Sequence, residues 1–435
     1  MLVVTVLVIA VGPVATVAAE DLTVDEAVSR ALSGDPRIQS ALLEAAAARS
    51  SVEEAQWSRL PSLSVSAGYT RLSHVSSSIS FGSAEVSLDS QDNAYSLQAN
   101  LQYPVFAGYR LRESITLAEL AAQGKAIGVD ATRSAVAFET ERAYWEALRA
   151  ENIVAMMREN LSLTERNRDV TRRKLEQGTV LNADLLEAEM RCDQAEMDLQ
   201  DAIMRRDRAM LMLRSLVDPE GSQDLSLVSE PGSDVTIDGS EQDLVKDALE
   251  ARPELLAATL AVDVADANVG QARSALYPTV SVTGNYTYAN PNSRVAFQSD
   301  PAFTGTWMLG AQISYDLGGL PAHRSAIDTR EAEVRMRTAD ADRTERVVTQ
   351  DVRTCLLVYN RTRADLDLVS GMVDQAREHE RVVAQQVRLG AASDVDQLTA
   401  SVDRLRSEYA VVNKAIDLQI AAADLRRAAA IQRYE

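Results

Sequence analysis

The chain repeats itself, and this duplication constrains its fold more than any other feature. Residues 60–66 (LPSLSVS) match residues 277–283 (YPTVSVT) at an offset of 217. Further along, Gly178 matches Gly390 at an offset of 212, with similar residues around both glycines. An offset that drifts by only a few residues predicts two homologous halves, each built from the same elements in the same order.

The predicted boundaries follow from this comparison. The first repeat is assigned to residues 20–215 and the second to residues 243–435. The segment 216–242, rich in Gly, Ser, Asp and Pro, is assigned as a linker that also forms part of an equatorial region. Residues 1–19 carry no charge and end in small residues, which is typical of a secretory signal cleaved after Ala19. An uncleaved membrane anchor is the alternative interpretation of this segment.

Alternation of apolar and small polar residues predicts four strands, at about 62–73, 93–106, 279–289 and 306–317. A period of two gives each strand one apolar face and one polar face, as in strands of outer-membrane barrels that meet lipid on one side and water on the other. A soluble sandwich with the apolar face on its own core is the alternative. The predicted membrane-facing residues are Tyr69, Tyr95, Leu97, Leu101, Tyr103, Tyr286, Tyr288, Trp307, Leu309, Ile313 and Tyr315.

Four strands are too few to close a barrel, and an open sheet edge is not tolerated in lipid. A membrane location therefore requires several copies of the chain. The pattern alone allows a dimer with eight strands or a trimer with twelve. The polar segments inside the two strand pairs, 74–92 and 290–305, are expected to be exposed loops.

The longest predicted elements are helices. No proline interrupts residues 108–177 or 322–390, which predicts helices of about 70 residues and about 105 Å. The return helices, 182–215 and 394–433, are expected to pack antiparallel on them because the connections are short. Shorter amphipathic helices are expected at 23–58 and 241–275, each interrupted near a proline.

The two hairpin turns have matching chemistry. A glycine with positive φ is expected to end each long helix, and Asn182 or Asp394 is expected to cap the return helix four residues later. Val180 and Leu181 form an apolar pair that is either a docking contact or a staple that only caps the turn. The tip residues are Gly178, Thr179, Val180, Leu181, Asn182, Gly390, Ala391, Ala392, Ser393 and Asp394.

A row of large apolar residues follows the first turn. Met190, Met197, Met204 and Leu211 repeat every seven residues along the predicted return helix. A relay of thioether metal ligands is one interpretation. The heptad spacing favours a buried helix seam instead.

Composition and residue spacing argue against several protein classes. The 44 Lys and Arg against 64 Asp and Glu give a net charge of −20, which disfavours nucleic-acid binding. The three histidines are scattered, and no Gly-rich phosphate loop or His-centred triad is found, so neither an enzyme nor a metal or cofactor site is expected. Cys192 and Cys355 lie about 20 Å and about 50 Å from their hairpin tips, measured along the helices. The two thiols are therefore too far apart to form a disulfide.

In their duplicated order, these motifs resemble the TolC-like outer-membrane efflux family, over essentially the whole mature chain. The resemblance is carried by residues 60–63 and 277–280 before the strands, by 103–108 and 315–319 after them, and by the pattern Gly-x5-Asp-x-Leu-x-Ala that starts at Gly178 and at Gly390.

The resemblance implies a mainly α fold with a small membrane β part. Three chains would combine their long antiparallel helical hairpins into an α-barrel through the periplasm and their four β-strands each into a twelve-stranded β-barrel in the outer membrane. It also implies an inner-membrane transporter and a periplasmic adaptor that meets the hairpin tips. Asp396, Asp184 and Thr399 are the candidate residues of the constricted entrance, where some family members carry a second acidic residue in place of Thr399.

The function implied is a passive outer-membrane conduit of a tripartite efflux system, exporting small molecules and gated at the periplasmic tips. A conduit for type I protein secretion is an alternative within the same family. A periplasmic coiled-coil structural protein without a pore is the alternative from another class, and it leaves the four alternating strands unexplained.

Overall fold

The computed structural model describes residues 20–74, 76–82, 84–89, 92–218, 225–228, 235–295 and 302–431. The predicted signal segment, 1–19, lies outside these residues. The chain divides into two compact units. The first unit comprises residues 1–41, 129–255 and 344–435, and the second comprises residues 42–128 and 256–343.

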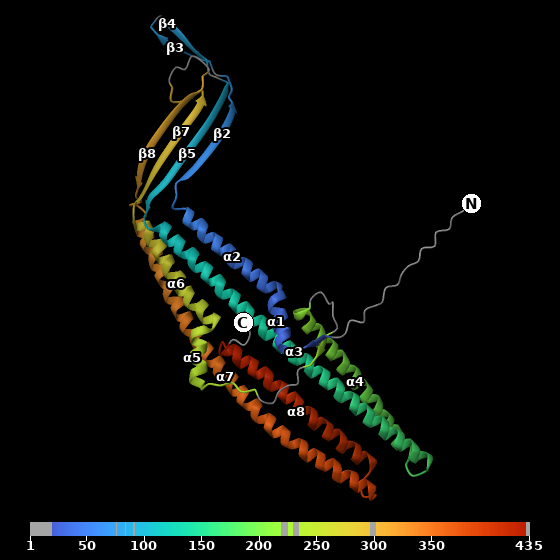
Figure 1. Ribbon diagram of the computed structural model, residues 1–435. Helices are drawn as coiled ribbons and strands as arrows, with labels where there is room; N and C mark the ends of the chain where they lie inside the picture. The colour runs from blue at the N-terminus through green and yellow to red at the C-terminus, as the bar shows by residue number, and fades with distance from the viewer. Residues whose placement is uncertain are drawn as a thin grey trace, which may run out of the picture. The chain divides into compact units, whose positions relative to one another are not determined.

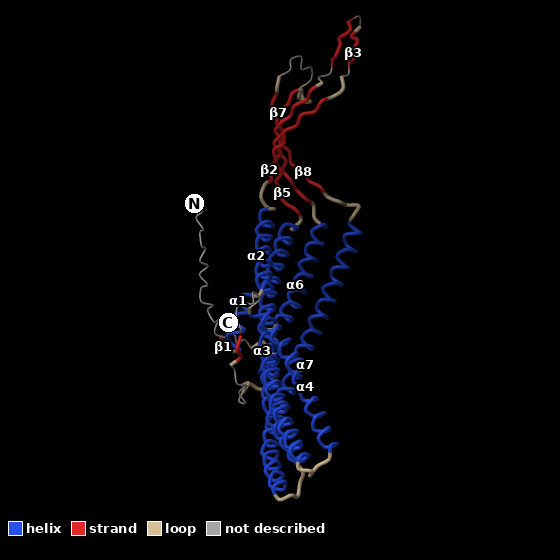
Figure 2. Tube along the Cα trace, turned by 90° about the vertical axis from the view of Figure 1, so that its right-hand side faces the viewer, coloured by secondary structure: helices blue, strands red, loops and turns tan. Residues whose placement is uncertain are grey.

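The second unit contains a four-stranded sheet (Figures 1 and 2). Its strands are β2 (Ser62–Arg71), β5 (Asn93–Ala107), β7 (Thr279–Asn290) and β8 (Thr304–Ser314), in the order β2-β5-β7-β8. All three pairings are antiparallel, and β5 with β7 joins the two sequence repeats. Within the chain, β2 and β8 are the two edge strands of this sheet.

The strand register separates an apolar face from a polar one. Leu63, Leu101 and Leu309 lie in one cross-strand row, and the adjacent row on the opposite face contains Ser64 and Asn100. The predicted membrane-facing residues within the strands all share the apolar face, and each exposes 38% or more of its surface in the single chain. Tyr315 was assigned to the last strand, but β8 ends one residue before it.

A β-bulge interrupts the alternation near the end of β5. The register shifts between Pro104 and Phe106, so Phe106 opposes Val280 on the apolar face. Proline has no N–H to donate to the ladder, which favours an irregularity at this position. The sequence predicted strict alternation of apolar and polar residues up to Val105. That prediction is wrong at Val105, where the bulge lies.

The predicted loop over 74–92 is also partly wrong, because most of it forms a hairpin. Strands β3 (Ser76–Phe81) and β4 (Ala84–Asp89) pair antiparallel as a separate two-stranded sheet. Of the second predicted loop, 290–305, residues 296–301 lie outside the described residues.

The helices follow the duplicated order. Thr23 and Ser240 cap α1 (Val24–Gly34) and α5 (Glu241–Ala251) with their side chains. Pro36 and Pro253 are the first residues of α2 (Pro36–Trp57) and α6 (Pro253–Arg273), a position at which the missing N–H of proline costs no hydrogen bond. The bounds are α1 (Val24–Gly34), α2 (Pro36–Trp57), α3 (Arg110–Glu176), α4 (Asn182–Val217), α5 (Glu241–Ala251), α6 (Pro253–Arg273), the 3-10 turn η1 (Ser274–Leu276), α7 (Leu320–Arg388) and α8 (Asp394–Ala428).

The first unit contains the two helical hairpins and most of the buried core. Within this unit α4 returns along the C-terminal part of α3, and α8 returns along that of α7 (Figure 1). Strand β1 (Glu20–Leu22) pairs in parallel with β6 (Leu225–Leu227), and the buried Tyr144 hydroxyl donates to the Leu22 carbonyl at 3.0 Å. Within the segment 216–242, β6 places Leu225 in a buried core cluster.

The heptad row on α4 is not buried against another helix of the same chain. Met190, Met197, Met204 and Leu211 each expose 58–65% of their surface. Small residues on another face of the helix are buried instead, among them Ala188 and Ala195. The prediction of a buried stripe is therefore wrong for the single chain, because heptad spacing identifies an apolar face without saying which helix covers it.

In the part of the chain that the structure describes, every helix falls short of the length and hydrophobicity that a membrane crossing requires.

One glycine is required at the junction between β5 and α3. Gly108 has φ +61°, and a Cβ added there would overlap the Ser274 carbonyl oxygen and lie 3.1 Å from the Tyr277 Cβ. Replacing it with alanine should lower the free energy of unfolding by about 1–3 kcal/mol because the left-handed backbone and the close approach both disfavour a side chain. Thermal unfolding in detergent, followed by circular dichroism, measures the effect.

Gly128→Ala is the matched control. Gly128 lies inside α3 with nothing within 4 Å of an added Cβ. This substitution should be neutral or stabilising by up to about 1 kcal/mol, since alanine favours the helix. Equal destabilisation by both substitutions would contradict the packing at Gly108.

Candidate functional site

The two hairpin tips share one backbone geometry. Gly178 and Gly390 have φ of +74° and +75°, which confirms the positive φ expected there. The amide of Thr179 donates to the Lys174 carbonyl at 2.9 Å, and the amide of Ala391 donates to the equivalent carbonyl of Gln386 at 2.8 Å. These bonds satisfy carbonyl groups that the end of a helix would otherwise leave unpaired.

The N-caps differ from the prediction by one residue. Helix α4 begins at Asn182 with Leu181 as its cap, and α8 begins at Asp394 with Ser393 as its cap. Asn182 and Asp394 are therefore the first helical residues. The sequence Ser393-Asp394-Val395-Asp396 carries the Ser-x-x-acid pattern of a capping box, a signal that identifies Ser393 without a structure.

The two candidate entrance aspartates occupy equivalent places, each three residues after its cap. Oδ2 of Asp396 accepts hydrogen bonds from the amide and hydroxyl of Ser393 at 2.8 and 2.7 Å. Oδ2 of Asp184 accepts one from the Leu181 amide at 2.8 Å. The Ser393 hydroxyl, and then its amide, hold the pKa of Asp396 below its usual 3.8, so this exposed carboxylate stays charged.

Thr399, the third entrance candidate, lies in the next turn of α8. Its hydroxyl donates to the Val395 carbonyl of the same helix at 2.9 Å. A threonine side chain is neutral, so Thr399 adds no charge to that of Asp396.

Asp394 reaches across to the other hairpin. Its carboxylate forms an ion pair with the Lys174 ammonium in the last turn of α3. Because these two residues belong to different sequence repeats, the pair connects the tips of the two hairpins.

This contact is the outermost of four ion pairs between α3 and α8, here called the α3–α8 ladder. Numbers rise along α8 as they fall along α3, as antiparallel helices require. The exposed fractions of the paired side chains fall from 41% and 27% at the tip to 14% and 5% at the far end. The members are Lys174–Asp394, Glu159–Arg404, Arg149–Asp417 and Glu141–Arg426.

Arg404 also binds within its own hairpin. Its guanidinium lies 2.8 Å from Glu380 on α7 and 2.6 Å from Glu408 one turn along α8. One side chain therefore connects α3, α7 and α8, with the contact to Glu159 the longest of the three at 3.6 Å. The sequence gives no signal for the ladder, because no periodicity shows which helices of the two repeats become neighbours.

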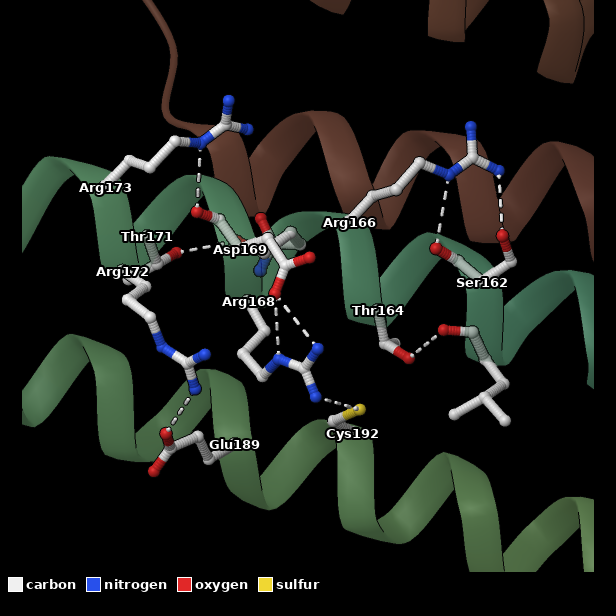
Figure 3. A network of polar contacts seen from close by, with 12 residues as sticks. Ser162, Thr164, Arg166, Arg168, Asp169, Thr171, Arg172, Arg173, Glu189 and Cys192 are labelled. Atoms are coloured by element: carbon white, nitrogen blue, oxygen red, sulfur yellow. Dashed lines mark hydrogen bonds and ion pairs between the residues drawn. The ribbon is translucent and has the colours of Figure 1, made fainter.

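Polar contacts also hold α3 against α4 (Figure 3). Arg172 pairs with Glu189 at 3.2 Å, and Arg168 donates to Cys192 Sγ at 3.7 Å while bonding Asp169 at 3.0 Å. Both cysteines are free thiols, with Cys192 buried and Cys355 half-buried. Among the described residues, no group of three or more His, Cys, Asp or Glu side chains could hold a metal ion.

The architecture defines a class of protein, namely a duplicated chain with two helical hairpins and a four-stranded sheet of one apolar and one polar face. The sequence profile of this class, described as outer membrane efflux protein, matches residues 27–217 and 244–430. The chain belongs to the outer membrane efflux protein family.

Individual relatives are distant. Outer membrane protein OprJ of Pseudomonas aeruginosa is 22% identical over 410 residues, which cover 92% of this chain and 82% of OprJ. The probable efflux pump outer membrane protein TtgC of Pseudomonas putida is 23% identical over 169 residues. That match spans 39% of this chain and about a third, 34%, of TtgC.

Solved structures share the fold. The Campylobacter jejuni CmeC outer membrane channel superimposes with a TM-score of 0.79 at 16% identity, covering 93% of this chain and 85% of CmeC. The open state of the Neisseria gonorrhoeae MtrE outer membrane channel gives 0.75 at 20% identity, covering 93% and 88%.

The cap at Ser393 yields a prediction with a defined pH dependence. A lowered pKa means that Asp396 stabilises the folded tip above pH 3.8, and that this contribution disappears as the pH falls through the folded-state pKa. Ser393→Ala should lower the thermal midpoint at pH 7 by about 2–4 °C. The difference from the parent protein should shrink as the pH approaches 3.

Ser407→Ala is the control, because the Ser407 hydroxyl donates only to the Asp403 carbonyl of its own helix, at 2.8 Å. It should leave the midpoint unchanged at both pH values. A Ser393→Ala effect that is the same at pH 7 and pH 3 would exclude the carboxylate from the cap.

Proposed function

We propose that this chain is one subunit of a trimeric outer-membrane conduit for small-molecule efflux, gated at the hairpin tips. The observation that carries the proposal is the sheet β2-β5-β7-β8, with an exposed apolar face, a polar face and two edge strands unpaired within the chain. A protein in water gains nothing from such a face, whereas lipid covers it favourably.

Three copies would remove both edges of the sheet. The N–H and C=O groups along β2 and β8 need partners in lipid, and β8 of one copy supplies them for β2 of the next in a closed cylinder. The strand count allows eight or twelve strands. Membership of the outer membrane efflux protein family favours twelve, and the exposed heptad row on α4 offers a seam between copies.

The α3–α8 ladder suits a gate at the tips. Its outermost pair, Lys174–Asp394, is much more exposed than the innermost pair, so water and salt weaken it more. Its innermost pair, Glu141–Arg426, is nearly buried and would resist opening. Opening would therefore start at the tips, where Asp184 and Asp396 stand as candidates for an acidic entrance.

The tips also offer contacts to a partner. Leu181 and Leu389 expose 72% and 75% of their surface at the two tips. TtgC is named as an efflux pump outer membrane protein, which supports a periplasmic adaptor and an inner-membrane transporter as partners of this chain. The conduit itself would carry out no chemistry, and no cofactor is proposed.

Ion conduction tests the proposal. Purified protein should have the mass of a trimer in detergent and should conduct ions, with a preference for cations, in planar bilayers. Asp396→Asn should reduce the cation preference, because three carboxylates close together attract cations strongly at short range. The reversal potential in a salt gradient measures the preference.

Asp374→Asn is the matched control, since Asp374 is an exposed α7 residue whose contact, Arg377, lies in its own helix. A water-soluble particle without conductance would refute the proposed function. Conduction with a cation preference unchanged by Asp396→Asn would remove Asp396 from the entrance.

The gate yields a separate prediction. Lys174→Met removes one ion pair of about 0.2–1 kcal/mol in each copy and should raise the open probability. Exchanging the charges, with Lys174→Asp and Asp394→Lys together, should restore the parent behaviour. An open probability that Lys174→Met leaves unchanged would place the gate elsewhere.

A further inference from the structure

The loop segment that follows β7 folds back over the polar face of the sheet. Asn292 is only 3% exposed, and its Nδ2 donates to the Thr304 carbonyl at 2.8 Å and to the Thr306 hydroxyl at 3.2 Å. Its Oδ1 accepts a hydrogen bond from the Arg294 amide at 3.0 Å. Thr306 opposes Thr287 in a row of the polar face, so these bonds fix the segment to that side of the sheet.

This arrangement places a cation on the polar face. Nη1 of Arg294 donates to the Trp307 carbonyl at 3.1 Å, and Nη2 donates to the Met308 sulfur at 3.8 Å. Met308 belongs to the same cross-strand row as Asn285 and Asn100. It is the fifth residue of β8, so the guanidinium lies at a level about 13 Å along the strand from its first residue.

No carboxylate of the sheet offsets this charge. Every residue of β2, β5, β7 and β8 is described, and none is Asp or Glu. Among the described residues, none forms an ion pair with the exposed Arg294 side chain. The cation within the strands, Arg71, shares the apolar face with Tyr69 and lies 3.8 Å from Asp92. The described part of the polar face therefore carries a net positive charge.

Three copies of the chain would bring three of these guanidiniums to one level of the proposed barrel. The helices of this unit join one end of the strands, and the β7–β8 loop leaves from the other end (Figure 2). In the proposed orientation the loop end faces the outside. Walls of low dielectric focus the field of fixed charges into a pore, and rings of arginine favour anions.

We propose that Arg294 is a charge-selecting residue of the barrel, and that its three copies form a positive ring near the outer end. The inference rests on the proposed function, because it requires the polar face to line a water-filled lumen. The ring favours solutes that carry carboxylate, sulfonate or phosphate groups. It repels cations at this level, including those that enter from outside.

Local thiol chemistry measures the field of this ring. The full chain with Asn100→Cys is reconstituted in vesicles, where residue 100 lies two strands from Met308, about 10 Å away. Two methanethiosulfonate reagents of similar size react with it, one with a trimethylammonium group and one with a sulfonate. Mass spectrometry follows modification at the introduced residue, so Cys192 and Cys355 do not interfere. The ratio of the two rates is divided by the ratio for a small free thiol.

At low salt the sulfonate reagent should be favoured about threefold or more, and this preference should disappear at high salt. The salt series needs no substitution at Arg294. Adding Arg294→Gln should abolish the preference, whereas Arg294→Lys keeps the charge and should retain it. A role limited to anchoring the loop would depend neither on the charge of the reagent nor on salt. In planar bilayers, Arg294→Gln should increase the cation preference of the channel.

Arg71→Gln is the matched control. It removes the cation that lies on the apolar face beside Asp92, and it should leave the ratio at residue 100 unchanged. A normalised ratio of one at low salt would overturn the inference. So would a sulfonate preference that Arg294→Gln leaves intact.

Ala99→Cys distinguishes failure of this inference from failure of the proposed function. Residue 99 lies on the apolar face, beside Asn100 in sequence but on the opposite side of the sheet. It should react with neither water-soluble reagent. Equal reactivity at residues 99 and 100 would place water on both faces and refute the membrane barrel itself. An unreactive residue 99 together with a ratio of one at residue 100 would refute the positive ring alone.

Discussion

Backbone groups in lipid must find hydrogen-bond partners, and this requirement governs the proposed assembly of the chain. Leaving one such group unpaired costs several kcal/mol, and a whole edge strand presents a row of them. The sheet β2-β5-β7-β8 satisfies its inner strands and leaves its two outer strands open. Closure by identical copies is the simplest remedy, since each copy brings one edge of each kind.

Duplication supplies the elements twice, but contacts between the copies of the repeat make them one structure. In the second unit that contact is the pairing of β5 with β7. In the first unit it is the α3–α8 ladder, whose innermost pair is nearly buried while the three pairs nearer the tips are substantially exposed. A graded seam of this kind favours opening from one end, because burial strengthens ion pairs with good geometry and solvent weakens exposed ones.

Predictions based on local chemistry agreed well with the structure, and predictions about contacts did not. The alternation in β7 and the positive φ at Gly178 and Gly390 depend only on neighbouring residues, and the structure confirms both. The stripe beginning at Met190 was expected to be buried, yet it is exposed in the single chain. Asp394 was expected to cap its helix, but Ser393 is the cap, which the local Ser-x-x-acid pattern indicates, and Asp394 pairs with Lys174. The exposure of the stripe and the pairing of Asp394 depend on which distant segments become neighbours, so no periodicity could identify them.

The sequence by itself determined the two repeats, the long helices, the tips and the two faces of the strands. These features follow from proline and glycine placement and from periods of 2 and 3.6 residues, which are short-range properties of the backbone. Only the tertiary structure decided the strand order, the bulge after Pro104, the hairpin within 74–92 and the charge pairs between α3 and α8. Each of these depends on which distant segments become neighbours, and that choice is made by burial and hydrogen bonding over the whole fold.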